Sequence, residues 1–352
     1  MSGMGDVLEN VAIDVWARVF SRSPRQVNAP HESDAELIEV PGASESYLAV
    51  TIDTVAEEVL AGLYRDARTI GWVAAMASLS DLAAVGADPL GLVISASVPP
   101  GTEPEFSGRA ARGMEDACRS VGVFVLGGDL NSAPAFSLTG CALGLVPRNA
   151  VLTRRGVRPG DTVLLTGPAG SGNALGLVRL AGLSEELFAE AEYRPSARLS
   201  AGGILRGRAH ACMDTSDGVL TTLDQLMRLN GCGFEIGCAW ERVLARDVLA
   251  LCASTGTPPW MMLAGPHGEF ELAFAAAPGD AEAIEGDLRR AGLAPVRLGT
   301  ARERETLTLA LPDGRRTDVD MAQARNLLET SGGDMRNYLS RFRELGKSWG
   351  IE

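Results

Sequence analysis

Five short segments of the sequence place an aspartate beside small or hydroxylated residues, next to an apolar stretch. They are Glu32-Ser33-Asp34, Thr51-Ile52-Asp53-Thr54, Ser78-Leu79-Ser80-Asp81, Gly127-Gly128-Asp129 and Asp214-Thr215-Ser216-Asp217-Gly218. Any single aspartate of this kind can simply cap a helix. Taken together, short carboxylates beside Gly, Ser and Thr supply the oxygen ligands that Mg²⁺ prefers, and Mg²⁺ is commonly shared between protein carboxylates and nucleotide phosphates. The pattern therefore predicts a magnesium–nucleotide site.

The charged side chains limit the partners that this chain can have. Asp and Glu total 45 against 32 Lys and Arg among 352 residues, which gives a formal net charge of -13. A chain of this charge repels phosphate backbones, so we expect no nucleic-acid partner. An anionic substrate must instead be held by local arginines, backbone N–H groups or a bound cation. The single lysine, Lys347, lies near the C-terminus, which argues against a P-loop lysine or a Schiff-base lysine.

The elements that must position these aspartates alternate between short β-branched runs and helical stretches, which predicts an α/β or α+β fold. In the first half we expect strands at 36–40, 47–52, 92–98, 123–126 and 136–146, and helices at 5–20, 70–85 and 104–121. In the second half we expect strands near 162–166, 210–214, 233–236, 269–276 and 305–311, and helices near 171–183, 198–206, 218–230, 242–254, 280–291 and 335–346. The helix at 5–20 is expected to be amphipathic.

A polar, turn-rich stretch at 147–161 separates the two halves and predicts a domain boundary. We therefore expect an N-terminal domain over residues 1–149 and a C-terminal α/β domain over residues 150–352. The N-terminal apolar stretch carries acidic residues, unlike a secretory signal, and no apolar run approaches the length of a membrane span. The six cysteines include no C-x-x-C pair. These features predict a cytoplasmic protein with no membrane partner.

The order of the motifs resembles that of the thiamine-monophosphate kinase family. The resemblance rests on Asp53 in Thr-Ile-Asp-Thr, Asp81 in Leu-Ser-Asp-Leu-Ala-Ala-Val-Gly-Ala-Asp-Pro, the Gly127-Gly128-Asp129 turn, Arg154 ahead of Arg158-Pro159-Gly160-Asp161, and Asp214-Thr-Ser-Asp217-Gly218. It extends from about residue 32 to residue 276. The family belongs to a superfamily with aminoimidazole ribonucleotide synthetase, selenophosphate synthetase and the hydrogenase maturation dehydratase.

The resemblance implies a fold, a reaction and a set of site residues. The implied fold has two domains, with Mg-ATP in the cleft between them, and forms a homodimer in which the N-terminal sheets build a shared barrel. The implied reaction is transfer of the ATP γ-phosphate to thiamine phosphate, a small-molecule acceptor, through positioning and electrostatics. The implied magnesium ligands are Asp34, Asp53, Asp81, Asp129 and Asp217. The implied catalytic residues are Asp81, Asp129, Asp217 and Arg154, and the implied nucleotide contacts are Thr54, Gly127, Gly128, Arg154, Asp214 and Ser216.

Several positions depart from the family's motifs. Glu32-Ser33-Asp34 replaces Gly-Asp-Asp, Val73 replaces a lysine, Ser78 an asparagine and Leu60 a histidine, and Gly265-Pro266-His267-Gly268-Glu269-Phe270-Glu271-Leu272 replaces Gly-Gly-Glu-Asp-Tyr-Glu-Leu. The segment from Gly167 to Leu177 resembles the family's glycine-rich turn into a helix, which can cradle an anion. These departures leave open a paralogue that phosphorylates another small substrate, a ring-closing synthetase of the same superfamily, and a catalytically silent nucleotide-binding dimer.

Overall fold

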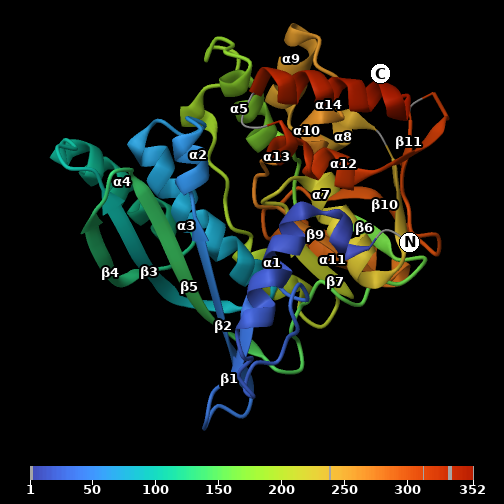
Figure 1. Cartoon of the computed structure of the whole chain (residues 1–352). Coiled ribbons are helices and arrows are strands. Elements are labelled where there is room, and N and C mark those ends of the chain that lie inside the picture. The colour runs from blue at the N-terminus through green and yellow to red at the C-terminus, as the bar shows by residue number, and fades with distance from the viewer. Residues whose placement is uncertain (1–2, 238, 312, 332–334, 352) are drawn as a thin grey trace.

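The computed structural model describes residues 3–237, 239–311, 313–331 and 335–351, and these form two mixed α/β units, each built around its own sheet (Figure 1). Among the described residues, no helix combines the length and the apolar character needed to cross a lipid bilayer. Five of the six cysteines lie in this part of the chain and are free thiols, and Cys238 lies outside it.

The N-terminal sheet has the strand order β1-β2-β5-β3-β4. Its strands are β1 (Glu36–Glu39), β2 (Ser46–Thr54), β5 (Ser137–Pro147), β3 (Asp88–Val98) and β4 (Val125–Ser132). All neighbours are antiparallel except β3 and β4. One face is covered by helices α3 (Ala67–Ala84) and α4 (Pro104–Ser120), and the short helix α2 (Ala56–Leu60) follows β2. Helix α3 is rich in small apolar residues, so it can be buried on most sides and can carry Asp81 between the two units.

Helices α3 and α4 approach each other through two glycines. A Cβ atom on Gly71 would lie 1.8 Å from the carbonyl oxygen of Ala110, and one on Gly113 would lie 2.0 Å from that of Arg68. Any larger side chain at these positions would force the two backbones apart. The glycines therefore set how closely the pair packs and hence where α3 runs across the sheet.

The opposite face of the N-terminal sheet, which we call the open face, carries apolar side chains that stay exposed or half-exposed. They are Leu48, Val50 and Ile52 of β2, Val93 of β3, and Leu143 and Leu145 of β5. Ile52 has 69% of its surface exposed. The sheet is open at both edges, so the barrel implied by the family resemblance is not closed within this chain.

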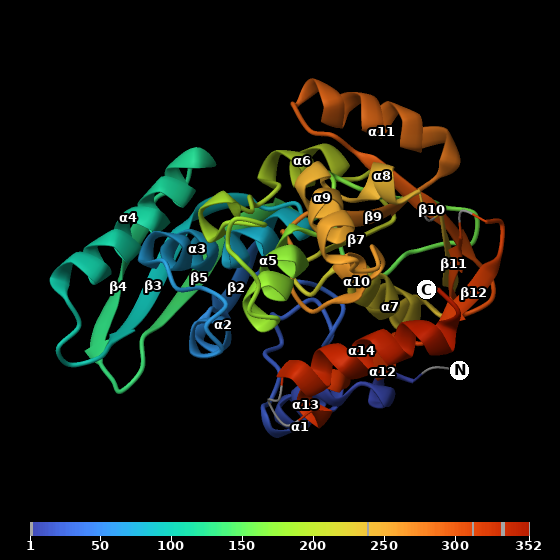
Figure 2. The same cartoon turned by 90° about the horizontal axis from the view of Figure 1, so that it is seen from above.

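The C-terminal sheet has seven strands in the order β12-β11-β8-β10-β6-β9-β7. They are β12 (Arg316–Val319), β11 (Leu307–Ala310), β8 (Gly233–Gly237), β10 (Val296–Arg302), β6 (Thr162–Leu165), β9 (Leu272–Ala276) and β7 (Ala211–Asp214). Helices α6 (Leu199–Leu205) and α11 (Pro278–Arg290) contribute to a small core on one face. Helices α5 (Ser171–Leu180), α7 (Val219–Asn230), α10 (Met261–Ala264) and α14 (Met335–Trp349) lie on the other, as Figure 2 shows from above. The remaining helices are α8 (Trp240–Val243), α9 (Arg246–Thr255), α12 (Met321–Arg325) and α13 (Leu327–Thr330).

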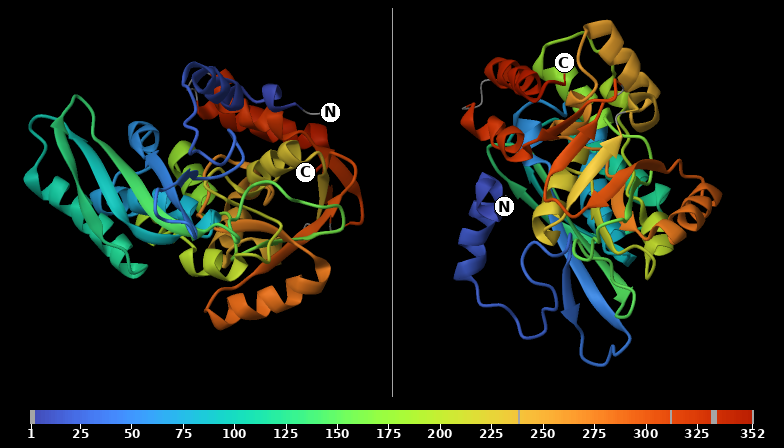
Figure 3. Two further views of the ribbon diagram at one scale, coloured as in Figure 1. Left: turned by 90° about the horizontal axis from the view of Figure 1, so that it is seen from below. Right: turned by 90° about the vertical axis from the view of Figure 1, so that its right-hand side faces the viewer.

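Helix α1 (Leu8–Val19) lies beside the C-terminal helices, although these are distant from it in the sequence (Figure 3). Polar contacts hold it there: the Leu8 N–H donates to Asn326 Oδ1 at 3.0 Å, and the Asn10 side chain donates to Gln225 Oε1 at 3.3 Å. The predicted helix forms and Val7, just before α1, is buried, but the apolar residues within α1 do not reach a core, and Trp16 is 68% exposed. Hydrophobic burial is therefore not what fixes this helix.

The structure overturns one sequence prediction of local structure and adds two strands that were not predicted. The segment from Gly127 to Asp129 is not a turn but lies inside β4, where Gly128 pairs with Ile94 of β3. A Cβ atom on Gly128 would lie 2.2 Å from the carbonyl oxygen of Ile94, so glycine is required here by close strand packing. The strands β10 and β12 were not expected, because a bulge between Arg297 and Gly299 interrupts the alternation that begins β10, and β12 is mostly polar.

Candidate active site

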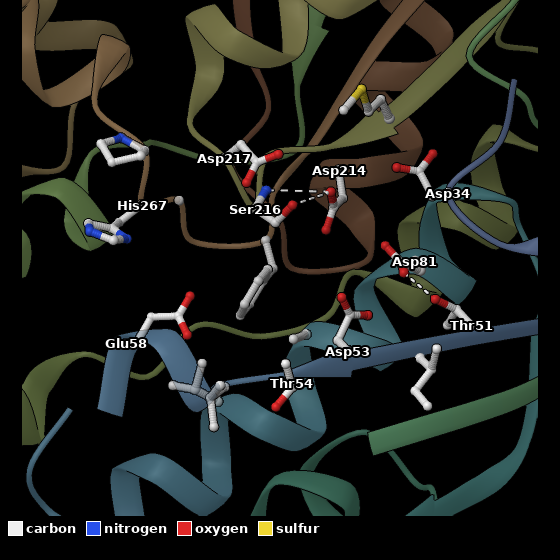
Figure 4. A pocket seen from close by; sticks show the side chains of 18 of the residues that line it. Asp34, Thr51, Asp53, Thr54, Glu58, Asp81, Asp214, Ser216, Asp217 and His267 are labelled. Carbon is white, nitrogen blue, oxygen red and sulfur yellow. Dashed lines mark hydrogen bonds between the residues drawn. The ribbon is translucent and has the colours of Figure 1, made fainter. Parts of the chain in front are cut away.

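A cavity of about 380 Å³ lies where β2 and α3 of the N-terminal unit meet the segment after β7 of the C-terminal unit. The segment 213–217 and the loop 266–270 close it from the C-terminal side, and Arg154 comes from the connection between the two sheets. Figure 4 shows the side chains that point into it. Its carboxylate side chains are Glu9, Asp34, Asp53, Glu58, Asp81, Asp214 and Asp217.

Three of these carboxylates form a compact cluster. Asp34 precedes β1, Asp81 lies in α3 and Asp214 ends β7, yet one oxygen from each lies within 4.8 Å of the other two. Asp53 of β2 and Asp217 line the same cavity. Five aspartates from four separate stretches of the chain therefore converge, as a metal-bound nucleotide would require.

Hydrogen bonds orient two members of the cluster. The Thr51 hydroxyl donates to Asp81 Oδ2, and the Ser216 hydroxyl and N–H donate to Asp214 Oδ1 at 3.0 Å and 3.4 Å (Figure 4). The second oxygen of Asp214 is buried without a hydrogen-bond partner, and so is one oxygen each of Asp34 and Asp53. Buried acceptors without partners are costly, so these oxygens are suited to a ligand that the chain alone does not provide.

The carboxylates repel one another in a site with little access to water. Burial and the Asp34 carboxylate raise the pKa of Asp214 to about 7. Burial and Glu9 raise the pKa of Asp217 to about 6, and burial together with Asp53, Asp214 and Asp34 raises the pKa of Asp81 well above its ordinary value. Such a site binds either protons or a cation at neutral pH.

Arg154 is the one arginine among the residues that line the cavity. Its Nη2 donates to Asp34 Oδ1 at 3.0 Å, while its Nε is buried and has no hydrogen-bond partner. Burial opposes its charge, but Asp34 and the neighbouring Asp81 and Asp214 raise its pKa above the ordinary value. Arg154 therefore stays charged and keeps a donor for a further anionic group.

Glu32 does not take the place of the family's missing aspartate in this cavity. Its carboxylate accepts from Arg155 Nε at 2.5 Å and from the Ala29 N–H at 2.8 Å. These contacts lower the pKa of Glu32, chiefly through the Ala29 hydrogen bond. The side chain thus holds the loop before β1 in place, and Asp34 is the carboxylate of the triplet that faces the site.

Three of the residues predicted from the sequence do not reach the cavity of this chain. Asp129 of β4 lies opposite Ser95 of β3, and Ser95 lies opposite Thr139 of β5. Thr139 in turn lies opposite Thr54 of β2, which is at the cavity edge. Three strand spacings, about 14 Å, therefore separate Asp129 from Thr54. Gly127 and Gly128 lie beside it on β4, whereas Thr54, Ser216 and Asp214 do line the cavity.

The glycine-rich turn before α5 already holds a carboxyl group that belongs to the chain itself. The Gly170 N–H donates to Glu269 Oε2 at 2.6 Å. Burial and the nearby Glu271 raise the pKa of Glu269 to about 8, while the N–H groups at the start of the helix oppose this shift. Glu269 is thus an internal partner of α5, and it does not line the cavity.

Sequence reasoning missed several residues of the cavity wall. Glu58 lies four residues after Thr54, but no local pattern distinguishes it from the neighbouring Glu57. His267 and Tyr193 were not among the predicted site residues, but both line the cavity. Burial lowers the pKa of His267 to about 4, so its ring is neutral at pH 7. No local signal marks Tyr64.

The raised carboxylate pKa values predict how stability depends on pH. An aspartate whose pKa is about 7 in the folded protein and about 4 in the unfolded chain stabilises the fold below pH 4, and this contribution is lost as the pH rises through 7. We therefore expect the free energy of unfolding of chelator-treated protein to fall by about 1 kcal/mol for Asp214 between pH 6.5 and pH 8. Denaturant unfolding at both pH values measures this, and Asp214→Asn should remove that part of the slope. An identical slope in the variant would contradict the assignment.

Comparison with known proteins agrees with this geometry. The family model described as AIR synthase related protein, N-terminal domain, matches residues 32–146, and the C-terminal domain of the same family matches residues 158–311. The thiamine-monophosphate kinase of Halobacterium salinarum is 34% identical over 237 residues, which cover 67% of this chain and 78% of that protein. The chain belongs to the thiamine-monophosphate kinases of the AIR synthase related family.

Solved structures show the same fold. The crystal structure of a thiamine-monophosphate kinase from Stenotrophomonas maltophilia K279a has a TM-score of 0.67 and 25% identity, and the match covers 86% of this chain and 95% of that one. A structure described as AaThiL complexed with AMPPCP and TMP has a TM-score of 0.71 over 90% of this chain and 96% of that one. At 22% identity, this second likeness extends to the fold alone.

Because the chain belongs to this family, the positions that depart from the family's motifs are substitutions in this chain, and the structure shows where they lie. Val73 lines the cavity, so the lysine expected there is replaced by an apolar wall. Ser78 is fully buried and its hydroxyl donates to the Gly140 carbonyl at 2.9 Å, so it joins α3 to β5 instead of facing a substrate. Leu60 is 71% exposed and is not part of the cavity wall.

Proposed function

We propose that this chain is an ATP-dependent kinase that transfers the γ-phosphate of ATP to thiamine phosphate, giving thiamine diphosphate and ADP. The proposal follows from its relatives, which are thiamine-monophosphate kinases. The observation that carries it is the meeting of Asp34, Asp81 and Asp214 in one cavity, with oxygens within 4.8 Å of one another. An acceptor phosphate oxygen attacks the γ-phosphorus in line, and ADP leaves with the electrons of the broken bond.

Magnesium fits the residues that are present. The wall holds seven carboxylates against one arginine, and three of the aspartates have a buried oxygen without a hydrogen-bond partner. When bound, Mg²⁺ neutralises the phosphates and holds the triphosphate in place. The residues that would hold it are Asp34, Asp53, Asp81, Asp214 and Asp217. Arg154 would donate to a phosphate oxygen, and Thr54 and Ser216 would position the nucleotide at the edge of the site.

We further propose a homodimer that forms through the open face. An uncovered apolar sheet face of this kind is typical of an interaction surface. Asp129 is on the same face as Ile52 and Thr54, because side chains alternate along a strand and Asp129 is in register with Thr54. Pairing two open faces would build a shared barrel, and we propose that it brings Asp129, Gly127 and Gly128 of one protomer to the cavity of the other.

We place the domain boundary at residues 149 and 150, in the connection between the two sheets. We propose a cytoplasmic enzyme with no nucleic-acid partner, because the chain is acidic and ATP is an intracellular substrate.

The direct test is to incubate the purified protein with ATP, MgCl₂ and thiamine monophosphate and to follow the products by phosphorus NMR. We expect ADP and thiamine diphosphate in equal amounts. ADP formed only with other small acceptors would favour the divergent paralogue. Valine in place of the family's lysine at position 73 is consistent with that alternative. No ADP with any acceptor, together with tight Mg-ATP binding, would replace the kinase by a silent nucleotide-binding dimer.

A further inference from the structure

The cavity has two chemically different ends (Figure 4). Asp34, Asp53 and Asp81 gather at one end, and Glu58 and His267 lie at the other. Tyr64, Tyr193, Phe270 and Val73 complete the lining. The first end is explained by the metal and the nucleotide, and the second remains for the acceptor.

Glu58 brings into this second end a carboxylate with one oxygen that has no hydrogen-bond partner. Its Oε2 is buried and has no hydrogen-bond partner, and Figure 4 shows the carboxylate pointing into the cavity. Burial, with Glu57 and Asp53 nearby, raises the pKa of Glu58. A half-buried carboxylate in this state is destabilising unless a positive group comes to it.

The described residues of the cavity wall supply no such positive group. Arg154 is paired with Asp34 at the metal end. His267 is neutral at pH 7, because burial lowers its pKa to about 4. At position 73, where the family resemblance leads us to expect a lysine, the side chain is valine. The second end is therefore anionic and has no internal counter-ion among these residues.

Tyr64 lines the same cavity as Glu58, and burial, followed by the nearby Glu58 carboxylate, raises the pKa of Tyr64. Tyr64 and Tyr193 stack with ring centroids 6.0 Å apart and an interplanar angle of 13°. The Tyr193 hydroxyl donates to the Gly268 carbonyl at 2.5 Å, which fixes this pair against the loop that carries His267. Rigid aromatic faces next to an unpaired carboxylate are the surroundings that an organic cation prefers.

We propose that the Glu58 end of the cavity is a subsite for an organic cation and that Glu58 determines this specificity. The inference rests on the proposed function and deepens it. The acceptor carries a delocalised positive charge on a ring that lies against Tyr64, with its phosphate arm directed towards the aspartates. The positive charge pairs with the Glu58 carboxylate, so a neutral ring of similar shape binds less tightly.

The test compares two acceptors on three proteins by calorimetry, in the presence of Mg²⁺ and AMPPCP. Thiamine monophosphate carries the cationic thiazolium, and 4-methyl-5-(2-phosphooxyethyl)thiazole is a neutral counterpart with the same phosphate arm. We expect Glu58→Gln to weaken thiamine monophosphate about tenfold or more and to change the neutral thiazole by less than about twofold. Glu57→Gln, which removes the same charge from the exposed neighbouring residue, should change neither.

Equal losses for both acceptors in Glu58→Gln, or no loss for either, would overturn the cation subsite. Turnover distinguishes this failure from failure of the kinase proposal. ADP formation with unchanged KM for thiamine monophosphate in Glu58→Gln would remove the subsite and leave the kinase. Selective weakening of the cation in a protein that forms no ADP would remove the kinase and leave the subsite.

Discussion

Asp81→Asn should lower turnover by more than about 100-fold and at the same time leave the metal-free protein as stable as the wild type or more stable. Asp81 is one of the three aspartates whose oxygens converge, so the variant loses a negative charge where we propose that the metal binds. Burial and the carboxylates of Asp53 and Asp214 raise its pKa well above the ordinary value, which means that its charge is unfavourable in the fold without a cation. Function and stability should therefore move in opposite directions.

Steady-state kinetics with varied Mg²⁺ and thermal unfolding in chelator measure the two effects. Asparagine still accepts from the Thr51 hydroxyl, so the local hydrogen bond is kept. Asp280→Asn, on the exposed first turn of α11, makes the same chemical change far from the cavity and should alter neither quantity. Turnover near the wild-type rate in Asp81→Asn would show that the cluster does not hold the metal.

Mixing two inactive variants should restore activity if Asp129 acts across the dimer. Asp81→Asn and Asp129→Asn homodimers each lack one group in both of their sites. In a mixed dimer, one site receives Asp81 from the Asp129→Asn chain and Asp129 from the Asp81→Asn chain, so it is complete. Equal amounts, exchanged to equilibrium, should give about a quarter of the wild-type activity, since half of the dimers are mixed and each has one intact site.

The experiment uses chains with different affinity tags, so that mixed dimers can be isolated by two successive captures. Mixed dimers of Asp81→Asn with Asp53→Asn are the matched control, because both residues line the cavity of one chain and no site becomes complete. Activity that stays at the level of the two parents in the Asp129 mixture would place Asp129 in its own chain's site or outside the reaction.

Local patterns were sufficient for most of the fold. The helix predicted at 104–121 is α4 (Pro104–Ser120), and the strand predicted at 136–146 is β5 (Ser137–Pro147). Each has a clear hydrophobic period, and proline begins the helix. Periodicity was not sufficient where another interaction decides the structure. Gly128 is a glycine because the neighbouring strand packs closely against it. In α1 polar contacts hold the helix, and its apolar side chains stay exposed.

The cavity was predicted in part because several of its wall residues are short carboxylates in recognisable segments. Asp34, Asp53, Asp81, Asp214 and Asp217 do meet in one cavity. Glu58, Tyr64 and His267 could not be assigned in the same way, because a residue joins a cavity wall through the packing of several elements. That packing also explains Glu269, which the sequence alone could not distinguish from a cavity residue and which binds the Gly170 N–H instead.

The most direct test of the account is to titrate AMPPCP into the wild-type protein by calorimetry, once with MgCl₂ and once with EDTA. The seven carboxylates of the wall repel a bare triphosphate, and only Arg154 attracts it. We therefore predict saturable binding with Mg²⁺ and no measurable binding with EDTA. Binding of equal strength in both buffers would mean that the nucleotide does not depend on a metal held by these aspartates, and it would contradict the account.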